Sequence, residues 1–243
     1  MRDLQIVERI TATVPWLGAV TGWNAQFGRE LNATDDRGAF MPRGGHIRGR
    51  PVLEGKQIGP FRVDLAQSAW ELPVEAVVSR RAARRTRLAY RDVASATNRL
   101  TLIAALIPAH AVTTHTLFCL KTPLPLEHQE VLCALLNSFV ANYLIRLRVN
   151  THVTASLMSR LPVPLVNPER PEFARLRTLT QTLMRSSDVE NAAEYHELQA
   201  IAARLYGLSA ADFEHVLGTF PLIPEAVRLA AYKRFTLVTD ETH

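Results

Sequence analysis

Cysteine is scarce in this chain of 243 residues, which contains only Cys119 and Cys133. Both lie in apolar stretches with no further cysteine at metal-ligand spacing, so we expect buried free thiols, as in cytosolic proteins, and find no support for a disulfide. No apolar run is long enough to span a bilayer, and the first residues, with Arg2, Asp3 and Glu8, are unlike a signal peptide. We therefore expect a cytoplasmic protein with no membrane partner.

Recognisable catalytic signatures are lacking as well. The sequence contains no phosphate loop of the Walker type, no Gly-x-Gly-x-x-Gly after a predicted strand, and no His-x-x-x-His or Cys-x-x-Cys pair. Asn167-Pro168 is followed by Glu-Arg, so it is not the Asn-Pro-Pro-aromatic loop with which an amino-methyltransferase holds a flipped base. The scattered histidines are expected to be structural. The sequence predicts no catalytic residue, no metal site and no cofactor site within this chain.

Positive charge is abundant and unevenly distributed. Residues 37–99, here called the basic segment, contain thirteen Lys and Arg against five Asp and Glu, a net charge of +8, whereas the rest has fifteen against eighteen, a net charge of −3. Seven of these arginines fall within residues 80–99. An arginine run is usually a solvated surface. A basic segment on an otherwise mildly acidic chain is instead typical of a polyanion-binding surface, because guanidinium groups match phosphate oxygens and the guanine edge.

The hydrophobic pattern predicts an α/β (α+β) fold. Residues 126–148 carry apolar side chains at three- and four-residue spacing, which predicts one amphipathic helix packed on the sheet. Two further helices are expected over residues 172–184 and 192–206, and Ser209 with Asp212 forms a capping pattern for another. Short β-prone stretches are expected to form the strands of a mainly antiparallel mixed sheet: 52–58, 61–63, 88–90, 100–107 and 113–120. We expect one domain over residues 1–166, followed by a helical C-terminal region over residues 167–243.

Several blocks of the chain, taken in order, resemble the C-terminal target-recognition region of type IIG restriction-modification enzymes and related phage-defence DNA adenine methyltransferases. Residues 51–58 (Pro-Val-Leu-Glu-Gly-Lys-Gln-Ile) are similar to the family's Pro-Leu-Tyr-Glu-Gly-Lys-Met-Ile block, and residues 91–108 look like its arginine-to-proline block. Asn142 stands where the family's Leu-Asn-Ser-Phe helix usually has Asp, and residues 149–153 lack the family's glycines. The remaining similar blocks are 27–40, with Trp23 upstream and a closing turn at 35–40, then 161–164, 206–209 and 213–221.

The resemblance implies a module that recognises duplex DNA for an adenine-N6 methyltransferase. In that family an upstream domain binds S-adenosylmethionine and carries the Asn-Pro-Pro-Tyr loop, and this chain has neither. The implied partners are double-stranded DNA and a methyltransferase catalytic domain or subunit. The chain itself would then be a fragment, one half of a split gene or a stand-alone remnant of a site-specific DNA-methyltransferase.

The candidate DNA-binding residues are those that the charge pattern and the resemblance indicate together. Lys56 is a candidate phosphate contact, although a lone lysine is equally a surface charge. Asn98 can form two hydrogen bonds to adenine, although an asparagine in a turn more often bonds its own backbone. Arg91 and Arg99 could instead form structural ion pairs with carboxylates. The full set is Lys56, Arg80, Arg81, Arg84, Arg85, Arg87, Arg91, Asn98, Arg99, Thr151 and His152.

Two functions of other classes stay open. The chain could be a protein-interaction module whose arginines meet an acidic partner, which would bind protein tightly without affinity for DNA. It could also be an enzyme with an unrecognised site, for instance an RNA-processing hydrolase.

Overall fold

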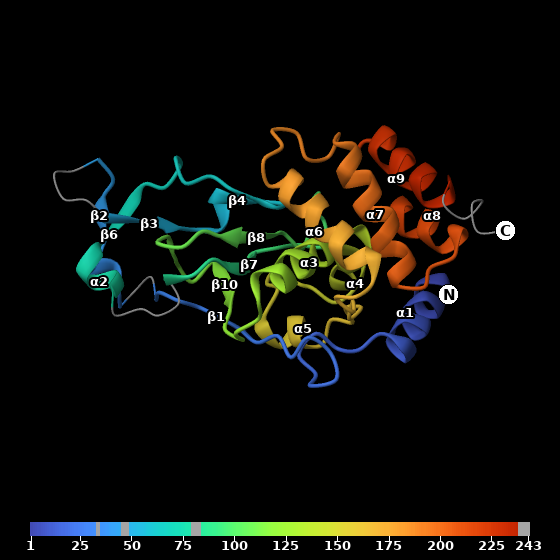
Figure 1. The fold of residues 1–243 in the computed structure, drawn as a ribbon, viewed down its shortest axis with the longest axis horizontal. Coiled ribbons are helices and arrows are strands. Elements are labelled where there is room, and N and C mark those ends of the chain that lie inside the picture. Colours follow the sequence, from blue (N-terminus) through green and yellow to red (C-terminus); the bar gives the residue numbers. More distant parts are fainter. Residues whose placement is uncertain (33–34, 45–48, 79–83, 238–243) are drawn as a thin grey trace.

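Strands and helices occupy opposite ends of an elongated molecule (Figure 1). The computed structural model describes residues 1–32, 35–44, 49–78 and 84–237. Helices and mixed sheets together confirm the predicted α+β class, and the C-terminal part is helical as predicted. The proposed boundary near residue 166 stays a prediction.

A four-stranded antiparallel sheet forms the middle of the molecule. Its strands, in spatial order, are β1 (Phe27–Gly28), β10 (Leu117–Leu120), β7 (Arg87–Arg91) and β8 (Ala104–Ile107). Both faces of β7 are covered, since Leu88 and Tyr90 join the core beneath the helices, whereas Ala89 joins a second cluster. This alternation follows from the two-residue period of a strand. The central sheet is therefore a buried layer that presents its strand ends to the surface.

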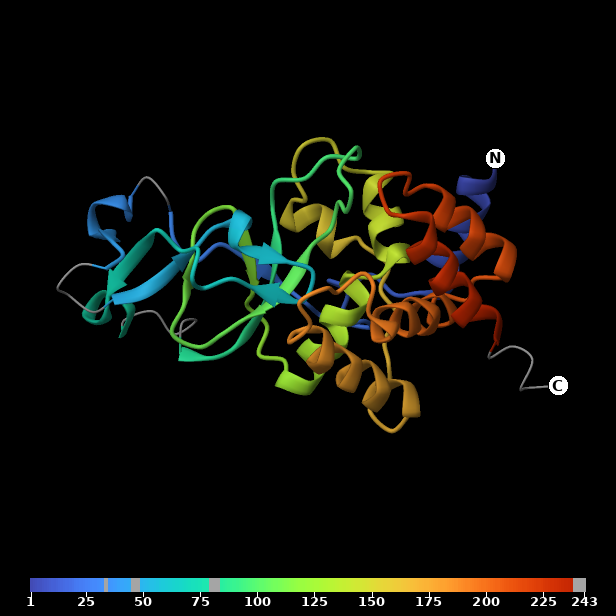
Figure 2. The same ribbon diagram turned by 90° about the horizontal axis from the view of Figure 1, so that it is seen from above.

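A second sheet forms the end of the molecule farthest from the C-terminal helices (Figures 1 and 2). Val52 in β3 is paired in parallel with Val112 in β9, which joins this sheet to the segment that follows β8. A short 3-10 turn, Gly55–Gln57, leads from β3 into a two-stranded hairpin that packs against β8. The elements here are β2 (Met41–Pro42), β6 (Trp70–Pro73), β3 (Gly49–Leu53), β9 (Val112–Thr113), the hairpin strands β4 (Ile58–Gly59) and β5 (Arg62–Val63), the 3-10 turn Arg37–Ala39 and helix α2 (Val74–Val78).

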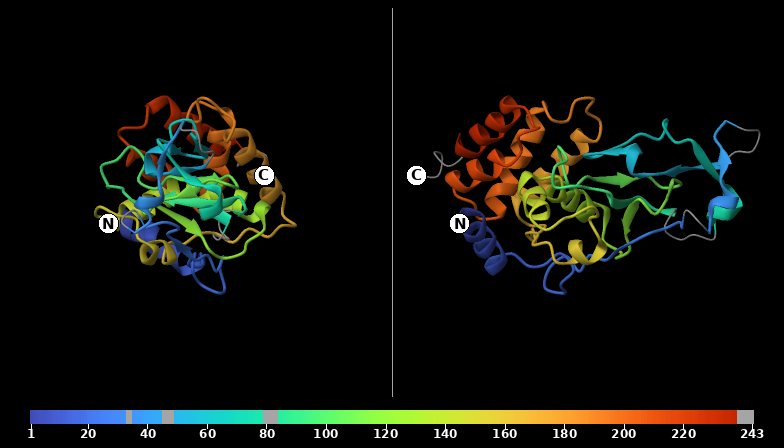
Figure 3. Two further views of the ribbon diagram at one scale, coloured as in Figure 1. Left: turned by 90° about the vertical axis from the view of Figure 1, so that its left-hand side faces the viewer. Right: turned by 180° about the vertical axis from the view of Figure 1, so that it is seen from behind.

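The helices cover one face of the central sheet and extend beyond it (Figure 3). Glu130 on α3 accepts hydrogen bonds from Arg177 and Gln181 of α6, which ties the C-terminal helices to the helix that lies on the sheet. The first helix was missed by the sequence pattern, and it buries Ile6 and Ile10. The helices are α1 (Arg2–Thr13), α3 (Leu126–Leu136), α4 (Phe139–Arg146), α5 (Ala155–Ser159), α6 (Pro171–Leu183), α7 (Ala193–Leu205), α8 (Ala210–Gly218) and α9 (Glu225–Leu237).

The single helix predicted over residues 126–148 is divided into α3 and α4. Ser138 adopts an extended conformation and its hydroxyl accepts from Ala141 N, which begins a new helix. The Asn137 carboxamide bonds both the N–H and the C=O of Ala104 in β8. A continuous helix would not place this carboxamide against the strand. The break therefore allows Asn137 to attach α3 and α4 to strand β8. Asn137 and Ser138, two polar residues in an apolar stretch, thus have structural roles.

Other expectations from local pattern are confirmed. Cys119 and Cys133 are buried and form no disulfide, and burial raises the pKa of Cys119 to about 12. Ser209 and Asp212 form the expected capping box at the start of α8.

Replacing Asn137 by alanine is expected to lower the free energy of unfolding by about 2 kcal/mol, because the buried N–H of Ala104 loses its acceptor. Urea denaturation followed by circular dichroism measures the change. Asn191→Ala is the matched control, because Asn191 is exposed and its side chain bonds only Asp188 among the contacts described, and a change below about 0.5 kcal/mol is expected. Equal effects of the two substitutions would contradict the proposed attachment.

Candidate nucleic-acid interface

The described residues of the basic segment form β2, β3, β6 and α2, the β4–β5 hairpin and strand β7, followed by the loop that carries Asn98 and Arg99. The candidate DNA-binding residues fall at three places along these elements: the start of β7, the end of β7, and a cleft beside the hairpin. Two of them, Arg80 and Arg81, lie outside the described residues.

At the start of β7, Arg84 and Arg85 are exposed. Arg85 donates from Nη2 to the carbonyl oxygen of Lys121 at 3.3 Å, which places a second cation beside it. Arg85 precedes β7 and Lys121 follows β10, the antiparallel neighbour of β7, so the two residues are distant in the sequence. The structure thus makes this end of the strand a basic surface.

Arg87, two residues farther along, lies in the interior. Its side chain is 1% exposed, and its Nε and Nη2 form a two-pronged ion pair with Glu30 at 2.6 and 2.5 Å. Nη2 also donates to the carbonyl oxygen of Ala111 at 2.8 Å. Burial alone would raise the pKa of Glu30, but hydrogen bonds and charge from Arg87 outweigh it and hold this pKa below its usual value. A guanidinium in this position cannot reach DNA, so Arg87 is not part of the interface we consider.

At the end of β7, Arg91 crosses to the hairpin. Its Nη2 donates to the carbonyl oxygen of Ile58 at 2.5 Å, and its Nε is buried without a hydrogen-bond partner among the described residues. A Cβ atom at Gly55 would lie 3.1 Å from the Arg91 side chain, so the glycine allows the close approach. Burial lowers the pKa of Arg91. Arg91 therefore links β7 to the turn that carries Lys56.

Asp92, the neighbour of Arg91, is the centre of a cluster that the sequence did not reveal. Its buried carboxylate lies 3.2 Å from Nη2 of Arg29 and 3.4 Å from Nδ1 of His152. Backbone hydrogen bonds from Ala94 to Thr151 and from Val153 to Asp92 hold the two loops together. Among the described contacts, the Asp92 carboxylate thus pairs with residues distant in the sequence and not with its neighbour Arg91, for which a structural ion pair was the alternative.

Thr151 and His152 are exposed beside this carboxylate, and the Arg29 guanidinium lies 5.0 Å from the centre of the Phe118 ring. The structure thus brings two candidate residues next to a half-exposed arginine that the sequence reading missed. No local signal marks Arg29, because it follows a two-residue strand outside the basic segment.

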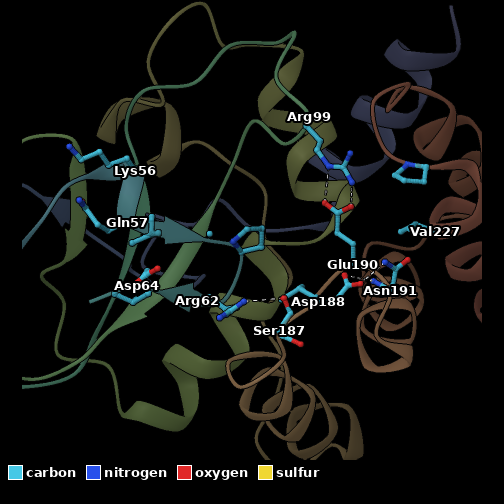
Figure 4. A pocket seen from close by; sticks show the side chains of 16 residues that line it. Lys56, Gln57, Arg62, Asp64, Arg99, Ser187, Asp188, Glu190, Asn191 and Val227 are labelled. Carbon is cyan, nitrogen blue, oxygen red and sulfur yellow. Dashed lines mark hydrogen bonds and ion pairs between the residues drawn. The ribbon is translucent and has the colours of Figure 1, made fainter. Parts of the chain in front are cut away.

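The third place is a cleft of about 660 Å³ between the β4–β5 hairpin and the loop around residues 187–191 (Figure 4). Arg62 donates across it to the carbonyl oxygen of Ser187 at 3.1 Å. Arg99 bonds both carboxylate oxygens of Glu190 and donates to the carbonyl oxygen of Leu222 at 2.6 Å. The cleft is thus bridged by two arginines of the basic segment, and the structural Arg–Glu pair considered for Arg99 is formed.

Lys56, which lines the cleft, and Asn98, the neighbour of Arg99, are two candidates with exposed side chains. The Lys56 side chain is 67% exposed, and its Nζ lies 2.9 Å from Oε2 of Glu54. The turn that carries Lys56 is closed by a capping box of Glu54 and Gln57. The Asn98 side chain is exposed, whereas its carbonyl oxygen accepts from Arg146 at 2.7 Å. Both residues are thus anchored through their backbones and keep their side chains outside.

The part of the chain that the structure describes contains neither a metal-ligand cluster nor a membrane-spanning helix. No group of three or more His, Cys, Asp or Glu side chains there is arranged to hold a metal ion. Among the helices of that part, none has the length and apolar character needed to cross a bilayer.

Comparisons with known proteins give a distant structural similarity. No protein-family model and no curated protein matches the chain. One solved structure with a similar fold is that of the Type IIL restriction-modification enzyme MmeI in complex with DNA, at 12% sequence identity and a TM-score of 0.49. The match covers 89% of this chain and 35% of that chain. The chain thus spans about a third of the length of the enzyme that it matches.

Proposed function

We propose that this chain is a DNA-binding specificity module that recognises a duplex target for a site-specific adenine methyltransferase of a restriction-modification or phage-defence system. The observation that carries the proposal is the separation of charge along the chain: the basic segment has a net charge of +8 and the remainder is mildly acidic, and the described part of that segment forms neighbouring strands and loops. A charge distribution of this kind attracts the phosphate backbone and is sensitive to salt. The order of the sequence blocks supports the same assignment.

Phosphate contacts and base contacts are assigned to different residues. Arg84, Arg85 and Lys56 have exposed cationic groups suited to phosphate oxygens. Asn98 and His152 have exposed side chains on loops, where they can reach base edges, and an asparagine carboxamide matches the N6 and N7 edge of adenine. Other candidates keep supporting roles within the proposal: Thr151 beside His152, Arg91 beneath the Lys56 turn, and Arg99 across the cleft.

Chemistry on the DNA is assigned to a separate partner. The proposed methyltransferase domain or subunit would bind S-adenosylmethionine and flip the target adenine into its own pocket. This chain would fix the position of that domain on the duplex.

Binding of the purified chain to a random pool of duplex DNA is expected to weaken steeply with salt, by at least about 100-fold between roughly 50 and 200 mM, because several phosphate contacts release counterions. Electrophoretic mobility shift at the two concentrations measures the change, and sequencing of the bound fraction reveals whether a motif is enriched. An enriched motif supports target recognition. Affinity that hardly changes with salt would refute the role of the basic segment, and absence of binding would favour the acidic-protein alternative.

A further inference from the structure

A second cavity, of about 860 Å³, is lined by residues of the C-terminal helices α6, α7 and α9 and by Arg170. Helix α7 contributes the partly exposed Ile201 and Leu205, which are four residues apart and therefore neighbours on one helix face, and the buried Ala200 lies beneath them. Leu237 of α9, which is 59% exposed, adds a further apolar side chain. The cavity, here called the C-terminal groove, thus has an apolar lining that solvent reaches.

Charged side chains at the groove are mostly paired with one another. Arg170 lies 3.0 Å from Glu172, and Glu197 accepts from Arg175 at 2.6 Å and from Arg234 at 3.4 Å. Three arginines therefore share the two carboxylates that line the groove.

Arg204, the fourth arginine of the groove, has no carboxylate partner among the described residues. Its Nη2 donates to the carbonyl oxygens of Arg234 and Phe235 at 3.1 and 2.5 Å, at the end of α9. Its Nε is buried and has no hydrogen-bond partner among the residues described. Burial and the neighbouring cation Arg234 both lower the pKa of Arg204. A half-buried guanidinium beside another cation and an apolar lining is best satisfied by an incoming carboxylate.

We infer that the C-terminal groove binds an acidic amphipathic helix of a partner protein, which places leucine-like side chains on the α7 face and a carboxylate on Arg204. The charge of the groove favours this occupant, since four arginines and two glutamates line it. A groove between helices with apolar positions at helical spacing is a common receptor for an amphipathic helix. Nucleic acid fits less well, because Glu172 and Glu197 would face its phosphates. The inference is independent of DNA binding.

Fluorescence anisotropy tests this with the full chain and a labelled synthetic peptide of about 16 residues, which carries leucines at helical spacing flanked by glutamates. A second peptide has lysine in place of every glutamate. The glutamate peptide is expected to bind at least about tenfold more tightly, because only it provides a charge-assisted hydrogen bond to Arg204. Equal binding of the two peptides, or no binding of either, overturns the inference.

Substitutions locate the binding site. Arg204→Met keeps the apolar stem and removes the guanidinium, and is expected to weaken binding at least about tenfold. Because Arg204 also bonds the end of α9, Arg170→Met is the second variant, which alters an exposed rim position and is expected to weaken binding about threefold. Arg185→Met makes the same charge change at an exposed position outside the groove and is expected to leave binding unchanged. Equal losses in Arg204→Met and Arg185→Met overturn the assignment.

Two other occupants of the C-terminal groove would give different experimental results. The six residues that follow Leu237 contain Asp240 and Glu241. If removal of these six residues tightens peptide binding at least about tenfold, the groove binds the chain's own terminus, and the inference of a partner protein is wrong. It is also wrong if sedimentation shows a dimer that Arg204→Met converts to a monomer, because the occupant is then a second copy.

Discussion

Glu30→Ala is expected to lower the free energy of unfolding by about 3–5 kcal/mol, the largest effect that we predict for a single substitution. The substitution leaves the Arg87 guanidinium in the interior without its carboxylate, and the three carbonyl oxygens that it also contacts cannot neutralise its charge. Glu30 additionally accepts from the backbone N–H and the hydroxyl of Thr113, so both lose a buried acceptor. Chemical denaturation followed by tryptophan fluorescence measures the change.

The dependence of the free energy of unfolding on pH, at acid pH, is a second measure of the same ion pair. The pKa of Glu30 is lower in the folded chain than its ordinary value of 4.5. Its contribution is therefore fully present above pH 4.5 and is lost as the pH falls toward and through the pKa of the folded state. The difference in stability between the wild type and Glu30→Gln is expected to shrink over this range.

Two controls separate the buried pair from surface charge. Glu172→Ala breaks the exposed pair with Arg170, and a loss of only about 0.5 kcal/mol is expected. The double variant Glu30→Leu with Arg87→Met removes both charges at once and is expected to be clearly more stable than Glu30→Ala. If Glu30→Ala and Glu172→Ala have the same effect, the interior position of Arg87 is wrong and this arginine is available to DNA.

Replacing Arg84 and Arg85 together by alanine is expected to weaken DNA binding about 100-fold at low salt. Each charge-assisted phosphate contact is worth about 1.5 kcal/mol, and two are removed. The slope of log affinity against log salt is expected to fall by about 2, since each phosphate contact contributes about 1. Anisotropy titrations of a labelled duplex over a range of salt concentrations measure both quantities.

The matched control is the double substitution of Arg170 and Arg185 by alanine. Both residues are exposed arginines, and both lie among the C-terminal helices outside the basic segment. This control removes the same total charge, so a purely global charge effect would weaken binding equally in the two double variants. Equal weakening would contradict the assignment of Arg84 and Arg85 to the interface, whereas both variants should retain the wild-type circular dichroism spectrum.

Local residue order was sufficient for the fold class and for several of the elements. The β-prone stretch 88–90 predicted a strand, which is part of β7. Ser209 and Asp212 predicted the start of α8 because a capping box is completed within one helical turn. The free thiols of Cys119 and Cys133 followed from their apolar neighbours. Each of these features depends on interactions between residues close together in the chain.

Helix ends were harder to predict where distant contacts decide them. The break at Asn137 exists because its carboxamide bonds Ala104, 33 residues away, and periodicity contains no information about such a partner. Helix α1 was missed because it buries only two apolar side chains, Ile6 and Ile10. Contacts with distant residues also hold it in place, such as the hydrogen bond that Tyr143 donates to Asp3.

The sequence by itself determined that this protein has a strongly basic segment on a mildly acidic α+β chain without a recognisable catalytic motif. Only the tertiary structure decided which arginines of that segment remain outside. Arg87 is buried because Glu30, 57 residues away, meets it in the interior, whereas Arg84 and Arg85, only three and two positions earlier, stay exposed. Neighbouring residues of one type receive different roles because burial of a charge requires a partner, and the fold brings that partner from elsewhere in the chain.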